Sequence, residues 1–97
     1  MQTDFRSANW KDLSFAIVGL GLIGGSYAKA LRRLGAKQII GVERNEATLA
    51  QAETMGIIDL GMTEADARLA QADIVICAIY PEAIANFIKS NVANFKS

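Results

Sequence analysis

The chain has 97 residues, 52% of them hydrophobic, and ten lysines and arginines balance ten aspartates and glutamates. This length and apolar content indicate one folded domain, or part of one, and exclude intrinsic disorder. The balanced charge argues against a nucleic-acid partner, and the lack of a long apolar run or a charge cluster argues against a membrane partner.

The first elements are an arm, a strand and a helix. Residues 1–12 are mostly polar, and we expect a loosely ordered arm. The apolar run over 15–18 is typical of a strand buried on both faces. The apolar residues that follow have helical spacing, and the helix they predict ends at Gly35, which suits a left-handed cap. The apolar face expected for this helix consists of Ile23, Tyr27, Ala30, Leu31 and Leu34.

The middle of the chain repeats this alternation. A second strand is predicted over 39–42. Asn45 is a suitable N-cap for the helix that follows, and Gly56 ends that helix. Residues 57–60 form a candidate third strand of short length.

The last part of the chain contains a short helix, a strand and a final helix. Residues 63–66 resemble a capping box, which predicts a short helix through Ala70. The apolar run 74–79 gives the strongest strand signal in the chain. Pro81 suits the first position of the last helix. The apolar face of that helix is expected to contain Ile84, Phe87 and Ile88.

Strands and helices therefore alternate throughout 13–97, which predicts an α/β domain with a parallel sheet and helical crossovers. Right-handed crossovers and the doubly wound, Rossmann-type topology give about four strands in the spatial order 3-2-1-4. We expect the strand over 74–79 to lie beside the strand over 15–18, with its other edge free.

A Gly-x-Gly-x-x-Gly motif at Gly19, Gly21 and Gly24 lies directly between the first strand and the first helix. In this setting the glycines permit a tight turn, close approach of a pyrophosphate, and close packing of the helix on the sheet. Glu43 follows the second strand, close to the spacing of about 20 residues expected for a ribose-binding acid. The pattern predicts a dinucleotide site at the helix N-terminus, where Ser26 is a further candidate donor. The alternative is a glycine-rich turn without a ligand.

The residues around the motif bear on the choice of cofactor. The Glu43 carboxylate is suited to accept hydrogen bonds from ribose hydroxyls and would repel a 2′-phosphate, so NAD is expected rather than NADP. Arg44 either stacks on adenine or approaches a 2′-phosphate, or it forms an ion pair with Glu46 or Glu53. Tyr80 follows the last strand, where it either lines the dinucleotide cleft or belongs to a simple turn.

Other chemistry is poorly supported. The absence of histidine excludes a Ser-His-Asp triad and a histidine-containing zinc site within this chain. Cys77, the only cysteine, is expected to be a buried and inert core residue. With no internal disulfide, the chain suits a reducing compartment, and we expect a cytoplasmic location. No residue is assigned as catalytic or metal-binding.

The segment 15–26 resembles the opening of the prephenate dehydrogenases, above all in the sequence Gly-Leu-Ile-Gly-Gly-Ser at 21–26. The segment 41–45 is similar to that family's Gly-x-Asp-Arg-Asn, with Glu43 in place of the aspartate. The resemblance covers roughly 13–90. It implies a cofactor-binding role for Gly19, Gly21, Leu22, Ile23, Gly24, Glu43, Arg44 and Tyr80.

The resemblance also implies an activity, the NAD(P)-dependent oxidative decarboxylation of prephenate to 4-hydroxyphenylpyruvate in tyrosine biosynthesis. The family's catalytic serine and histidine and its helical dimerisation domain come after the matching segment. We therefore expect the N-terminal cofactor-binding part of a homodimeric enzyme, inactive by itself. The alternatives are a stand-alone dinucleotide-binding module without catalysis and a segment of an arogenate dehydrogenase.

Overall fold

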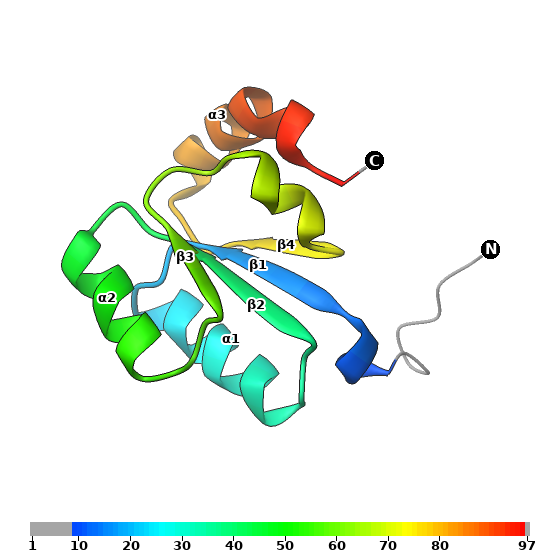
Figure 1. The fold of residues 1–97 in the computed structure, drawn as a ribbon. Helices are drawn as coiled ribbons and strands as arrows, with labels where there is room; N and C mark the ends of the chain where they lie inside the picture. The colour runs from blue at the N-terminus through cyan, green and yellow to red at the C-terminus, as the bar shows by residue number, and fades with distance from the viewer. Residues whose placement is uncertain (1–8, 97) are drawn as a thin grey trace.

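The computed structural model describes residues 9–96. At its centre lies a four-stranded parallel sheet with the order β3-β2-β1-β4 (Figure 1). The strands are β1 (Ser14–Val18), β2 (Gln38–Val42), β3 (Leu60–Met62) and β4 (Ile74–Cys77). The predicted fold class and strand order are confirmed, and β4 lies beside β1 as expected.

Helices cover both faces of the sheet, with α1 and α2 on one side and α3 on the other (Figure 1). They are α1 (Leu22–Arg33), α2 (Glu46–Thr54) and α3 (Pro81–Asn91), the last followed by a 3-10 turn, η3 (Val92–Asn94). Alternate residues of a strand point to opposite faces. Phe15 and Ile17 of β1 accordingly pack with α1 and α2, whereas Ala16 and Val18 pack on the α3 side. No helix within 9–96 is long and apolar enough to cross a membrane.

Helix α1 turns a different face to the sheet from the one predicted. Its buried residues are Gly24, Ala28 and Leu31. Because a Cβ on Gly24 would lie 1.7 Å from the Gly19 carbonyl oxygen, the helix approaches the sheet through its small residues. Leu31 alone of the predicted apolar face is buried, and the exposed residues of that face are Ile23, Tyr27, Ala30 and Leu34.

The local signals at helix ends are confirmed. Gly35 and Gly56 follow the C-caps of α1 and α2 with φ angles of +81° and +72°. Asn45 caps α2, since its side-chain oxygen accepts a hydrogen bond from the Thr48 N–H at 3.0 Å. Pro81 begins α3. These signals depend on the backbone conformation of a few residues, so they are legible without knowledge of the tertiary structure.

The third strand was predicted over 57–60, but β3 begins only at Leu60. Ile57 still belongs to the turn that ends α2, because its N–H donates to the Ala52 carbonyl oxygen at 3.2 Å. The N–H of Asp59 then donates to the Ile39 carbonyl oxygen at 2.7 Å. The apolar character of this segment therefore reflects its packing beneath the sheet more than strand structure.

The short helix predicted from the capping box at 63–66 is a 3-10 helix, η2 (Ala67–Gln71). Asp66 caps this helix by accepting a hydrogen bond from the Arg68 N–H at 2.9 Å. The box was therefore misread: its last residue caps η2, and Thr63 lies before the helix near the end of β3.

In the sheet formed by residues 9–96, β4 is an edge strand and pairs with β1. It ends at Cys77 rather than at residue 79, although the Ala78 N–H still donates to the Val18 carbonyl oxygen at 2.8 Å. All four of its side chains are only partly buried. Cys77 is therefore half-buried, contrary to the expected full burial, because an edge strand is covered on fewer sides.

The arm predicted over 1–12 lies largely outside the described residues, which begin at Asn9. The part that is described forms a 3-10 turn, η1 (Trp10–Asp12). The ring of Trp10 stacks on Phe15 with the ring centroids 5.7 Å apart. These residues thus pack on the first strand, unlike the loose arm that was expected.

Candidate functional site

The carboxyl ends of the four strands lie together at one edge of the sheet, the edge at which open α/β sheets bind ligands. The motif glycines follow β1 at this edge, Glu43 and Arg44 follow β2, and Tyr80 comes shortly after β4. The fold thus brings the sequence-predicted site residues to one place. The strand residues aligned there are Val18, Val42, Met62 and Cys77.

The three motif glycines have different surroundings. Gly19 has a φ of +92°, which side chains rarely tolerate. A side chain on Gly24 is excluded by the Gly19 carbonyl oxygen, so glycine is needed where α1 starts against the sheet. A Cβ on Gly21, in contrast, would meet no atom within 4 Å. Within residues 9–96, Gly21 therefore relieves no clash and instead leaves open space above the start of α1.

The N-terminus of α1 offers backbone donors. Gly21 is its N-cap residue, no side chain caps it, and no acidic residue lies in its first turn. The first N–H groups of a helix lack intrahelical acceptors and carry partial positive charge. The Ser26 hydroxyl donates to the Leu22 carbonyl oxygen at 2.8 Å, so its proton is used inside the helix rather than aimed at a ligand. The available donors of this turn are backbone N–H groups.

Glu43 connects the glycine loop to the start of α2. Its N–H donates to the Met62 carbonyl oxygen at 3.0 Å, which fixes its backbone against β3. Its Oε1 accepts a hydrogen bond from the Leu20 N–H at 2.8 Å, and its Oε2 accepts one from the Asn45 N–H at 2.9 Å. Within residues 9–96, no cation forms an ion pair with this carboxylate.

Arg44 and Tyr80 are both exposed and line a common surface hollow of about 430 Å³ at this edge. In the described part of the chain, Arg44 forms no ion pair with Glu46 or Glu53, so that predicted alternative is wrong. Tyr80 is 79% exposed and precedes α3 as its N-cap residue.

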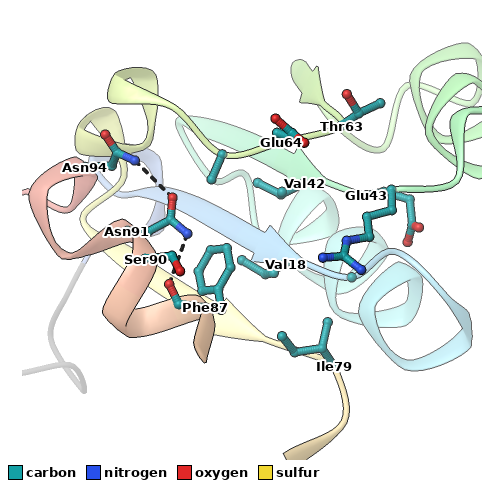
Figure 2. A pocket seen from close by; sticks show the side chains of 13 residues that line it. Val18, Val42, Glu43, Thr63, Glu64, Ile79, Phe87, Ser90, Asn91 and Asn94 are labelled. Atoms are coloured by element: carbon teal, nitrogen blue, oxygen red, sulfur yellow. Dashed lines mark hydrogen bonds between the residues drawn. The ribbon is translucent and has the colours of Figure 1, made fainter. Parts of the chain in front are cut away.

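A cavity of about 470 Å³ opens on the α3 side of the sheet, between the ends of β1 and β2 and helix α3 (Figure 2). The residues of α3 and η3 that line it are hydrogen-bonded to one another. The Asn91 side chain donates to the Phe87 carbonyl oxygen at 3.0 Å and accepts from the Asn94 side chain at 2.9 Å. Both apolar and polar side chains line it. The lining includes Val18, Val42, Glu43, Arg44, Thr63, Glu64, Ile79, Phe87, Ser90, Asn91 and Asn94.

A second cavity, of about 690 Å³, lies on the α1 side of the glycine loop. Gly19, Glu43 and Ile79 line both cavities, so the two cavities adjoin at the glycine loop. Further residues that line the second cavity are Gly21, Leu22, Ile23, Gly24, Tyr27, Ile76, Cys77, Ala78, Tyr80 and Pro81.

Several cavity residues were missed from the sequence. Thr63 and Glu64 follow β3 directly, and the rule that ligands bind at the carboxyl ends of strands would have identified them. Phe87 was predicted only as a core residue, and Ser90 was not singled out. Their position depends on how α3 crosses the sheet, for which the sequence carries no short-range signal.

Neither a metal site nor an activated thiol is found among residues 9–96. Among residues 9–96, no three Cys, Asp or Glu side chains gather to hold a metal ion. Cys77 lines the second cavity, but burial raises the pKa of its thiol, which disfavours the reactive thiolate.

A glycine-rich turn at the carboxyl edge of a doubly wound sheet defines an α/β domain of the Rossmann type. Residues 14–96 match the family described as NADP oxidoreductase, coenzyme F420-dependent, and the chain belongs to this family. A shorter match is with alcohol dehydrogenase-like 6 of Arabidopsis thaliana, 45% identical over 49 residues. It covers 50% of this chain and 13% of the Arabidopsis protein.

Two solved structures are similar to the chain over most of its length. Prephenate dehydrogenase from A. aeolicus, in complex with hydroxyphenyl propionate and NAD+, has a TM-score of 0.76 and 32% identity. Arogenate dehydrogenase from Synechocystis has a TM-score of 0.79 and 29% identity. In both comparisons 87% of this chain is covered, and the chain spans 30% of the other protein's length. The resemblance to prephenate dehydrogenases predicted from the sequence is thereby confirmed.

Proposed function

We propose that this chain is the part of an oxidoreductase that binds a nicotinamide dinucleotide, with 13–97 as the binding unit. The observation that carries the proposal is the open space over Gly21, at the uncapped start of α1 and close to the Glu43 carboxylate. Membership of an NADP oxidoreductase family supports it, as does the similarity to a dehydrogenase whose structure contains NAD+.

The pyrophosphate of the cofactor is proposed to lie over Gly21, where no side chain occupies the space. The backbone N–H groups of Leu22 and Ile23 donate to its oxygens, and the partial positive charge of the helix N-terminus favours the anion. Gly24 acts indirectly, because it lets α1 begin against the Gly19 carbonyl and so fixes where these N–H groups lie.

The adenosine ribose is proposed to donate its hydroxyl hydrogen bonds to Glu43. An ionised carboxylate has about four acceptor positions. The N–H groups of Leu20 and Asn45 use two of them, which leaves two for the ribose. A 2′-phosphate beside this carboxylate is repelled, so we propose NAD as the preferred cofactor, although the family description names NADP. Arg44 is assigned to stacking on the adenine.

We assign the two halves of the cofactor to different cavities. We assign the adenine to the cavity of about 470 Å³ on the α3 side, which Arg44 and Phe87 line. The nicotinamide half is assigned to the cavity of about 690 Å³ near Leu22 and Tyr80. The nicotinamide ring supplies hydride transfer when it is bound, and the residues of this chain bind and orient it.

The reaction proposed for the whole enzyme is the oxidative decarboxylation of prephenate by a homodimer. The motif resemblance and the similarity to the A. aeolicus enzyme support this substrate. Arogenate is the alternative, supported by the comparable similarity to the Synechocystis enzyme. Both proposals concern a protein longer than this chain, which spans 30% of either relative.

NMR titration of the ¹⁵N-labelled chain with NAD tests the binding site. We expect saturable shifts at the amides of Gly21, Leu22 and Glu43, and their loss in Gly21→Val, whose side chain fills the open space. Gly25→Ala is the matched control, because its Cβ makes only an ordinary contact at 3.6 Å. Shifts confined to another face of the sheet, or unchanged NAD binding by Gly21→Val, would contradict the proposal.

A second experiment tests whether the chain alone catalyses the reaction. Given NAD with prephenate or arogenate, the purified chain is expected to form no NADH above a protein-free control, because it has no histidine to act as a general acid or base. Turnover by the chain alone would contradict the proposal that this chain is only the cofactor-binding part of the enzyme.

A further inference from the structure

We propose that Glu43 is also a positioning residue: its carboxylate ties the glycine loop to the start of α2 and holds the loop ready for phosphate before any ligand binds. The inference rests on the proposed dinucleotide site and assigns the same side chain a second role there. It starts from the two hydrogen bonds that the carboxylate already makes, one from Leu20 and one from Asn45.

Leu20 is the residue of the loop that this tether holds. It lies between Gly19 and Gly21, and its side chain is only 5% exposed. Its Cδ1 atom lies over Gly41 of β2, where a glycine Cβ would come within 2.7 Å of it. The side chain thus anchors Leu20 on β2, and the Glu43 carboxylate accepts a hydrogen bond from the Leu20 N–H at 2.8 Å. Leu20, the residue that precedes Gly21, is therefore held twice: by its side chain on β2 and by its N–H on the residue that follows β2.

The carboxylate is itself held firmly. The Glu43 backbone is paired with Met62 of β3, and the Gly19 N–H donates to the Val42 carbonyl oxygen at 2.8 Å. The loop and the acid therefore sit on adjacent strands whose register is fixed by the sheet. Because no cation within residues 9–96 pairs with Glu43, the N–H groups of Leu20 and Asn45 determine where its carboxylate lies.

The positioning role has a consequence for ligand binding. A loop already held in its binding shape loses less conformational freedom when phosphate arrives, which raises affinity without a new contact. At equal charge of residue 43, loss of the tether should therefore weaken the binding of a ligand that has no ribose at all. A role limited to the ribose hydroxyls predicts no such effect.

Glu43→Gln and Glu43→Ala form a matched pair, because both remove the negative charge and only Gln keeps an acceptor oxygen. Leu20 is buried whereas Asn45 is exposed to water. A buried N–H without an acceptor costs more than an exposed one. The Gln oxygen should therefore remain on Leu20, which leaves the N–H of Asn45 to solvent.

Amide hydrogen exchange of the ligand-free protein is the first test. With rates expressed relative to Ile17 in β1, we expect Leu20 to exchange at least ~10-fold faster in Glu43→Ala than in wild type, and within about 3-fold of wild type in Glu43→Gln. The reference to Ile17 removes any global loss of stability. A relative Leu20 rate unchanged by Glu43→Ala would overturn the tether.

Titration with inorganic pyrophosphate, followed by NMR, is the second test. Glu43→Ala is expected to bind pyrophosphate at least ~3-fold more weakly than Glu43→Gln, since the two differ in the tether and not in charge. Equal affinity would overturn the positioning role while leaving NAD binding by wild type intact. If wild type bound neither pyrophosphate nor NAD, the proposed function would fail, and the exchange of Leu20 would still decide whether the tether exists.

Discussion

The amino-terminal and carboxyl-terminal edges of the sheet both use carboxylates to accept backbone N–H groups. At the amino-terminal edge, Asp59 accepts from the Ile39 N–H at 2.8 Å and Asp73 accepts from the Ser14 N–H at 2.9 Å. Each aspartate also donates its own N–H to the carbonyl oxygen of the same partner. The starts of the two central strands are therefore held by a reciprocal pair of hydrogen bonds. At the carboxyl-terminal edge, Glu43 holds a loop instead of a strand.

The counter-ions distinguish the two edges. Arg32 lies 3.0 Å from the Asp59 carboxylate, and Lys96 pairs with Asp73. Glu43 has no such partner among residues 9–96. Asp59 and Asp73 each have a cation that balances the charge of the carboxylate, whereas within residues 9–96 Glu43 is held by N–H groups alone and keeps its negative charge for the hydroxyl donors of a ligand. We infer that one edge serves stability and the other serves binding.

The largest expected effect separates two glycines of the carboxyl edge. Gly24→Ala should lower the free energy of unfolding by about 3 kcal/mol, because its Cβ would lie 1.7 Å from the Gly19 carbonyl oxygen. Gly21→Ala should stay within about 0.5 kcal/mol of wild type, since it meets no atom within 4 Å, yet it should weaken NAD binding. Urea unfolding measures both. Equal stability of the two variants would remove the distinction between packing and binding glycines.

At the amino-terminal edge, Asp59→Ala should cost about 1–3 kcal/mol, because the buried Ile39 N–H loses its side-chain acceptor. Asp59→Asn keeps an acceptor oxygen and should retain more of the stability. Both variants should bind NAD with wild-type affinity when folded, as shown by calorimetry below the unfolding temperature. A clear loss of NAD affinity in folded Asp59→Asn would show that the two edges are not separate in function.

A smaller effect on stability is expected at low pH. The hydrogen bond from Lys96, followed by that from the Ser14 N–H, holds the pKa of Asp73 below its ordinary value of 3.8. A carboxyl group with a lowered pKa in the folded state adds stability above its unfolded pKa and loses it as the pH falls through the folded pKa. The advantage of wild type over Asp73→Asn should therefore be constant above about pH 5 and shrink below pH 3.8. Urea midpoints for the two proteins that run parallel down to about pH 2.5 would contradict this.

The sequence predicted best what is encoded within a few residues. The glycine motif, the Asn45 cap and Pro81 at the start of α3 are local signals, and their positions in the fold are confirmed. The strand order followed from general rules of handedness and topology rather than from any single residue. Glu43 was expected at the end of β2, where it is found.

The predictions failed where tertiary contacts decide. The buried face of α1 is set by the close approach at Gly24, which outweighs the apolar periodicity of the helix. Ile57 and Ile58 were predicted as a strand because apolar runs in strands and in buried connections look alike. The hydrogen bond between Glu43 and Leu20 joins residues 23 positions apart, and no sequence spacing specifies it. The wall of the first cavity on α3 escaped notice for the same reason.

The most direct test of dinucleotide binding at the carboxyl edge is calorimetric titration of the chain with NAD and with NADP. We expect NAD to bind wild type at least ~10-fold more tightly, a difference of about 1.4 kcal/mol. Glu43→Ala should narrow the gap, mainly by weakening NAD, because charge-assisted hydrogen bonds to the ribose are lost. If NADP bound wild type as tightly as NAD, Arg44 rather than Glu43 would govern the site, and the assignment of the ribose to Glu43 would be wrong.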